Sequence, residues 1–111
     1  MRAIRGTAAS SVIAFRDISL VAIEKMYDIM GMKAVLFTPA ATRQWRKLSA
    51  DTRKRIDLKL TIYATNGSGD VRRLKGVGGC RLRIGDWRVI FIDDVRSITV
   101  IAVGNRKEIY D

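Results

Sequence analysis

The chain has 111 residues and a formal charge of +10, because its 21 lysines and arginines outnumber 11 acidic residues. That length supports one domain with a modest core, and an apolar content of 48% argues against disorder. With no histidine and a single cysteine, a zinc site or a Cys–His nucleophile is nearly excluded, so we expect no metal and no cofactor.

Residues 1–31 differ from the rest of the chain, because they hold four basic and three acidic residues while the other +9 charges lie in 32–111. Residues 17–30 can form one helix, since apolar residues recur there at loosely helical spacing and Gly31 then breaks the pattern. This N-terminal extension is either an added helix, used for packing or self-association, or the product of an upstream start with Met32 as the natural first residue. Residues 32–111 are expected to form a complete domain.

The domain begins with a predicted short strand at residues 33–37. A first helix should follow, because Thr38 is a good N-cap and Pro39 suits the first helical turn. Its amphipathic stripe consists of Ala41, Trp45 and Leu48.

A second helix can be capped by Ser49 or Asp51 and should end at the Asn-Gly-Ser-Gly loop of residues 66–69. Its apolar stripe consists of Ile56, Leu60 and Tyr63, widened by Leu58 or Ile62.

A hairpin follows, with strands at residues 81–84 and 87–91 and a two-residue loop at 85–86. Glycine at the first loop position fits a type II′ turn, which would pair Arg83 with Arg88. Because side chains alternate along a strand, three arginines should emerge on one face and five apolar side chains on the other. The arginines are Arg81, Arg83 and Arg88, and the apolar residues are Leu82, Ile84, Trp87, Val89 and Phe91.

A turn at residues 93–94 should lead into a last strand at 97–103, after which residues 104–107 run toward Tyr110. The order is strand, helix, helix, strand, strand, strand. It predicts an α+β fold, in which two N-terminal helices pack on one face of a mainly antiparallel four-stranded sheet. The arginines would then point from the opposite face.

The arginine cluster bears on function, because like charges directly opposite each other destabilise a sheet. At an effective dielectric near 20, charges about 4 Å apart repel by roughly 4 kcal/mol before salt screening. We expect an anion at this face, although the pattern also fits a solvated basic face with splayed arginines. The net charge indicates nucleic acid, the ribosome or an acidic protein as partner.

We expect a cytoplasmic protein that does not enter a membrane. Cys80 cannot form an internal disulfide, which is typical of a reducing compartment, and its strand parity places it among small core residues. No segment of the chain is apolar over a length that could span a bilayer.

Four segments carry a family pattern: 37–48, containing Phe-Thr-Pro-Ala-Ala and Trp-Arg-Lys-Leu; Leu-Lys-Gly at 74–76; the hairpin at 81–91; and Val-Gly-Asn-Arg-Lys-Glu-Ile-Tyr at 103–110. In this order and at this spacing they resemble the RelE/ParE toxin superfamily of bacterial and archaeal toxin–antitoxin modules. The resemblance covers residues 32–111, and the extension has no counterpart in it.

The resemblance implies one of two activities, since RelE-like members cleave mRNA in the ribosomal A site and ParE-like members poison DNA gyrase by binding it. For a RelE-like toxin it implies a metal-independent endoribonuclease, with Lys75 and Lys107 as RNA-binding residues. The implied catalytic residues are Arg81, Arg83, Arg88, Arg106 and Tyr110.

One departure from the family bears on the mechanism. RelE-like enzymes commonly have lysines where this chain has Arg81 and Arg83, and arginine does not lose its proton. The general base could then be Lys75, Lys107 or Tyr110, or could come from the ribosome and substrate. The leading interpretation is a type II toxin that cleaves mRNA, with a cognate antitoxin, the ribosome and mRNA as partners. The alternatives are a gyrase inhibitor and a non-catalytic nucleic-acid-binding module.

Overall fold

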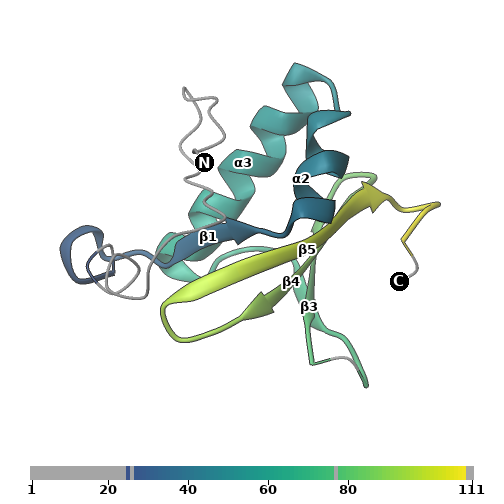
Figure 1. Cartoon of the computed structure of the whole chain (residues 1–111). Coiled ribbons are helices and arrows are strands. Elements are labelled where there is room, and N and C mark those ends of the chain that lie inside the picture. Colours follow the sequence, from purple (N-terminus) through teal and green to yellow (C-terminus); the bar gives the residue numbers. More distant parts are fainter. Residues whose placement is uncertain (1–24, 26, 77, 110–111) are drawn as a thin grey trace.

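The computed structural model of the chain describes residues 25, 27–76 and 78–109. In this part, two helices cover one face of a mixed five-stranded sheet (Figure 1). The strands are β1 (Ala34–Phe37), β2 (Val71–Arg73), β3 (Cys80–Ile84), β4 (Trp87–Asp93) and β5 (Ser97–Asn105), and the helices are α2 (Pro39–Arg46) and α3 (Ala50–Asn66). The predicted α+β architecture is confirmed.

The strands lie in the order β1-β5-β4-β3-β2. β1 is parallel to β5, and every other pair of neighbours is antiparallel. The sheet has one strand more than predicted, because β2 pairs with β3 at the edge, with Val71 opposite Leu82. The last strand also continues two residues beyond the predicted end at Val103.

Helical structure before β1 is described only in part. Residues 25 and 27–30 are helical, and the others of the predicted helix 17–30 lie outside the described residues. Gly31, at φ +67°, follows this turn, and its N–H donates to the carbonyl of Tyr27. Arg96, between β4 and β5, lies 4.8 Å from the Tyr27 ring centroid and forms a 3.1 Å ion pair with Asp28. These contacts attach the turn to the β4–β5 connection.

The helix boundaries follow the predicted capping residues. The Thr38 hydroxyl accepts a hydrogen bond from the Ala41 N–H at 3.1 Å, with Pro39 in the first turn of α2. Ser49, rather than Asp51, is the N-cap of α3. That helix ends at Gly67, whose φ of +77° is a left-handed conformation that glycine adopts without a Cβ penalty.

The core lies between the two helices and the sheet, as the apolar stripes predict. Leu48 and Trp87 are partly buried against the core. Of the two residues that could widen the second stripe, Ile62 is half-buried and Leu58 is 53% exposed. The predicted apolar residues that are buried are Ala41, Trp45, Ile56, Leu60, Leu82, Ile84, Val89 and Phe91.

A polar cluster ties α3 and the start of β1 to the end of β4. The Asp93 carboxylate accepts hydrogen bonds from Lys33 Nζ at 2.5 Å and from the Tyr63 hydroxyl at 2.6 Å. Burial alone would raise the pKa of Asp93, but these two hydrogen bonds, together with the positive charges of Lys33 and Arg73, outweigh it and lower that pKa. Burial, together with the bond to Asp93, raises the pKa of Tyr63 to about 12.

We expect this cluster to lose its contribution to stability at high pH. Because the folded-state pKa of Tyr63 lies above the ordinary value of 10.0, the contribution is complete below that pH and disappears as pH rises through about 12. Urea unfolding of the parent and the Tyr63→Phe variant across this range measures the effect. The parent should lose more stability than the variant, since lysine titration is common to both. Parallel losses would contradict the assignment.

Two further observations concern the described residues as a whole. Neither of the helices described is long and apolar enough to cross a membrane. Among the described residues, no group of three or more cysteine, aspartate or glutamate side chains is arranged to hold a metal ion.

Candidate functional site

The β3–β4 hairpin has the predicted register and carries the arginines on the predicted face. Arg83 pairs with Arg88 and Ile84 with Trp87, across a loop in which Gly85 has a φ of +60°. That sign at the first loop position, with no positive φ at Asp86, is the pattern of a type II′ turn. The arginines consequently lie on the sheet face opposite the helices.

The sheet face that carries Arg81, Arg83 and Arg88, called the arginine face below, is only partly exposed to solvent. Arg83 is exposed, but Arg81 is 6% and Arg88 2% exposed. Arg88 bends back along the hairpin, because its Nη1 donates to the carbonyls of Gly85 at 2.9 Å and Trp87 at 3.1 Å. The alternative of a solvated basic face therefore does not hold for Arg81 and Arg88, and these two carbonyls hold the guanidinium of Arg88 in place.

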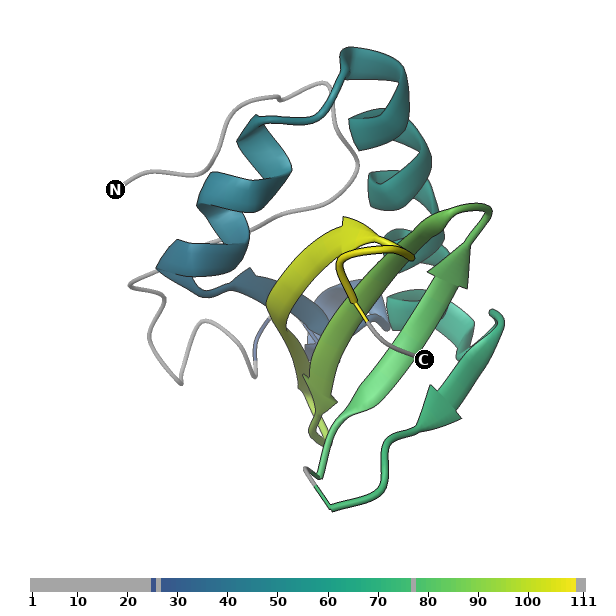
Figure 2. The ribbon, with the colours of Figure 1, turned by 90° about the vertical axis from the view of Figure 1, so that its right-hand side faces the viewer.

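The segment after β5 contributes to this covering. Figure 2 shows it turning back in front of the sheet. Gly104 lies directly opposite Arg88, and a Cβ there would lie only 3.0 Å from Ile109 Cδ1. Ile109 thus fills the space that the missing side chain leaves beside Arg88.

Hydrogen bonds also hold the segment after β5 in place where it leaves the strand. The Asn105 carbonyl accepts from the N–H groups of Glu108 and Ile109, and its side chain accepts from the Lys107 N–H at 2.9 Å. The Arg106 N–H donates to the Asp86 carbonyl at 2.8 Å. The backbone of Arg106 is therefore attached to the hairpin loop, at the same end of the sheet as Arg83 and Arg88.

The structure gathers most, but not all, of the predicted site residues. Arg83, Arg88, Arg106 and Lys107 come together around the hairpin loop, and both Arg106 and Lys107 are exposed. Lys75 is exposed in the β2–β3 connection, so the length of β3 separates it from them. Tyr110 lies outside the described residues, and its predicted role stays a prediction.

Arg72 is a basic residue of this face that the sequence analysis missed. It pairs with Arg81 across β2 and β3, so the two side chains lie on the same face, and Arg72 is exposed. Without β2 in the predicted sheet, nothing placed Arg72 beside Arg81. By contrast Cys80 lies in the core as predicted, and burial raises the pKa of its thiol, which disfavours a nucleophilic thiolate.

This arrangement is suited to binding a phosphate or a similar anion. Guanidinium groups hold anionic oxygens through charge-assisted, often bidentate hydrogen bonds. Arg88 is held by backbone carbonyls, while Arg83 and Arg106 reach solvent beside it. The acidic contact of Arg83 is weak, since Asp70 lies 4.0 Å from Arg83 Nε and both side chains are more than half exposed.

Comparison with known proteins identifies the family. Residues 35–110 match the model of the ParE toxin of type II toxin–antitoxin systems. The mRNA interferase toxin RelE of Escherichia coli K12 is 30% identical over 81 residues, which are 67% of this chain and 85% of that protein.

Solved structures of toxin–antitoxin complexes contain chains of similar fold. The RelB–RelE complex of Methanococcus jannaschii contains a chain that is 26% identical, with a TM-score of 0.58 over 68% of this chain and 95% of that one. The RelE–RelB complex of Pyrococcus horikoshii gives a TM-score of 0.59 at 21% identity, over 70% of this chain and 99% of that one. The chain is thus a member of the RelE/ParE superfamily of toxins from type II toxin–antitoxin systems.

Proposed function

We propose that this toxin is a ribosome-dependent mRNA endonuclease whose substrate phosphate binds at the arginine face. The observation that carries the proposal is the direct pairing of Arg83 with Arg88, together with the attachment of Arg106 to the same hairpin loop. The relatives named as mRNA interferases, at 30% identity, support this choice among the activities of the superfamily.

The chemistry of RNA cleavage suits these residues. Attack by a 2′-hydroxyl on the neighbouring phosphorus forms one P–O bond and breaks the bond to the 5′-oxygen. Negative charge develops on the phosphate oxygens and on the leaving oxygen, where fixed guanidinium groups stabilise it. The exposed Arg83 would hold the phosphate oxygens and Arg106 would face the leaving oxygen, while the buried Arg88 would add positive charge beside them. Tyr110 would contact the base or help to move the proton.

The proposal includes a cognate antitoxin as partner, because the similar structures from M. jannaschii and P. horikoshii are toxin–antitoxin complexes. A chain of charge +10 favours an acidic or partly apolar antitoxin segment. Such a segment would neutralise the exposed cations of the arginine face or cover the helices.

Inhibition of DNA gyrase is the second candidate. Two observations favour it: the family model that matches is that of ParE, and arginines replace the lysines that RelE-like enzymes commonly carry on β3. A toxin of this kind would act by binding alone, so the arginine face would be a contact surface.

Primer extension on cellular mRNA after induction of the toxin separates the two candidates. Discrete cuts inside translated codons, which disappear when translation is blocked, are expected for the endonuclease. Intact mRNA together with double-strand breaks in DNA would overturn the proposal in favour of gyrase inhibition.

We also expect Arg83→Ala to flatten the salt dependence of RNA binding. Each lost phosphate contact should lower the slope of log affinity against log salt by about 0.7 for a single strand. Fold stability should persist, since Arg83 is exposed. Filter binding over a salt series measures the slope, and Lys59→Ala, which removes an exposed cation from α3, is the matched control. Equal slopes in parent and Arg83→Ala would place the phosphate elsewhere.

A further inference from the structure

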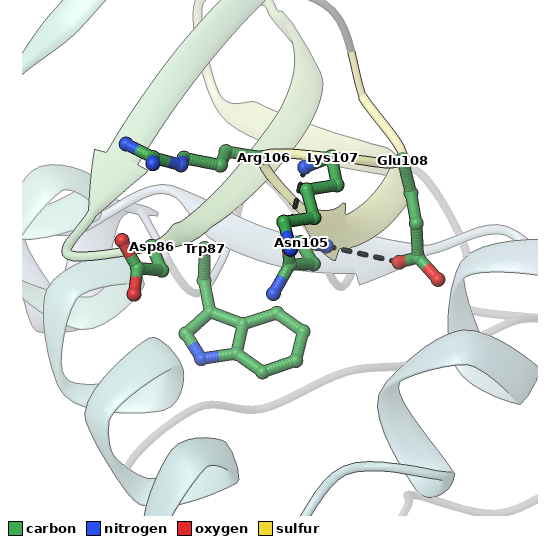
Figure 3. A pocket seen from close by; sticks show the side chains of 6 residues that line it. All are labelled: Asp86, Trp87, Asn105, Arg106, Lys107 and Glu108. Carbon is green, nitrogen blue, oxygen red and sulfur yellow. Dashed lines mark hydrogen bonds between the residues drawn. The ribbon is translucent and has the colours of Figure 1, made fainter.

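A cleft of about 540 Å³ lies at the end of the sheet, beside the hairpin loop. Its wall combines one aromatic ring with cationic, acidic and amide side chains (Figure 3). The lining residues are Asp86, Trp87, Asn105, Arg106, Lys107 and Glu108.

Trp87 occupies an unusual position for a residue of the apolar side of the hairpin. It is the first residue of β4 and pairs directly with Asn105, the last residue of β5, so their side chains share a face. The indole packs partly against the core but stays partly exposed toward the cleft. Figure 3 shows the ring beside the Asn105 amide, while Arg106 extends toward the side where Asp86 lies.

The mixture of groups in the cleft limits what it can hold. Asp86 and Glu108 would repel a bare run of phosphates, although Arg106 and Lys107 would attract a single one. The indole offers a stacking surface, and carboxylate and amide groups can pair with the polar edge of a planar ring. Of common ligands, a nucleotide unites these features, with its base on the ring and its phosphate on the cations.

We propose that this cleft binds one unpaired base of a single-stranded RNA whose neighbouring phosphate lies on the arginine face. The inference rests on the proposed function and adds a base-binding subsite to it. Trp87 and Arg88 are consecutive residues on opposite faces of β4, and Arg106 borders both the cleft and the hairpin loop. A strand passing around this end of the sheet would therefore contact both surfaces.

The test uses the full chain with hexa-adenylate RNA and an abasic ribose-phosphate oligomer of equal length. The chain has two tryptophans, of which Trp45 is 8% exposed, so a change in emission on RNA binding should come from Trp87. Trp87→Leu removes the ring and should weaken binding of hexa-adenylate on the order of 10-fold. Trp87→Phe keeps a ring, and should retain binding within a few-fold while losing the emission change.

The controls separate this inference from simpler explanations. The abasic oligomer should bind the parent and Trp87→Leu equally, and thermal unfolding must show that both variants are folded. Equal affinity of the parent and Trp87→Leu for hexa-adenylate would overturn the subsite, as would equal binding of the two oligomers by the parent. A stronger response to oligodeoxyadenylate would overturn the assignment to RNA.

Failure of this inference is distinguishable from failure of the proposed function. Emission changes with hexa-adenylate, without ribosome-dependent cleavage of mRNA, would support the subsite and overturn the endonuclease. Cleavage of mRNA, without any response of Trp87 to hexa-adenylate, would overturn the subsite alone.

Discussion

Replacing Arg106 by alanine should lower ribosome-dependent cleavage of mRNA on the order of 100-fold or more, as the removal of a preorganised donor to a developing negative charge does. The side chain is exposed and the backbone N–H that bonds the Asp86 carbonyl is unchanged by the substitution, so the melting temperature should stay the same. The measurement is the rate of cleavage on purified ribosomes programmed with a defined codon.

Arg43→Ala is a suitable control, because it removes an exposed guanidinium from α2, on the far side of the sheet. Arg88→Ala is a poorer test of catalysis, since Arg88 is buried and bonds two carbonyls of the hairpin. Its loss should also destabilise the fold, by about 1–3 kcal/mol. If Arg106→Ala cleaves at the parental rate, the arginine face does not act on the scissile phosphate.

Leu60→Ala should lower the free energy of unfolding by about 2–5 kcal/mol, because it removes a fully buried side chain and leaves a cavity between α3 and the sheet. Leu58→Ala makes the same chemical change two residues away, where the side chain is 53% exposed, and should change stability by less than about 1 kcal/mol. Urea unfolding of the two variants measures the difference. Similar losses would mean that α3 packs with a different face toward the sheet.

The parts of the fold that could be predicted from the sequence are those with strong local signals. Glycine at position 85 and the alternation of arginines with apolar residues determine the hairpin register, because a slip by one residue would turn every arginine into the core. Thr38 and Ser49 mark helix starts in the same way, since their hydroxyls satisfy N–H groups that a helix leaves without partners.

β2 could not be predicted because it has no such signal. It spans three residues, two of them exposed arginines, and its strand conformation depends on pairing with β3 rather than on its own composition. Arg72 was lost from the predicted site for that reason. The burial of Arg88 was also beyond the sequence pattern, since alternation assigns a face but not what covers it. Here Ile109, in a turn after the last strand, supplies part of the cover beside Gly104.

The topology of the sheet also bears on the order in which the fold can form during synthesis of the chain. β5 is the last strand to be synthesised, yet it lies between β1 and β4 and pairs with the first strand of the domain. This pairing joins residues that are far apart in the sequence, so we expect it to form late and to limit the rate of folding. A nascent chain that stops before Ser97 leaves β1 without this neighbour and lacks Arg106 as well. Premature termination products that end before Ser97 should therefore fail to complete the sheet, and they also lack Arg106 and Lys107, the exposed cations that directly follow β5.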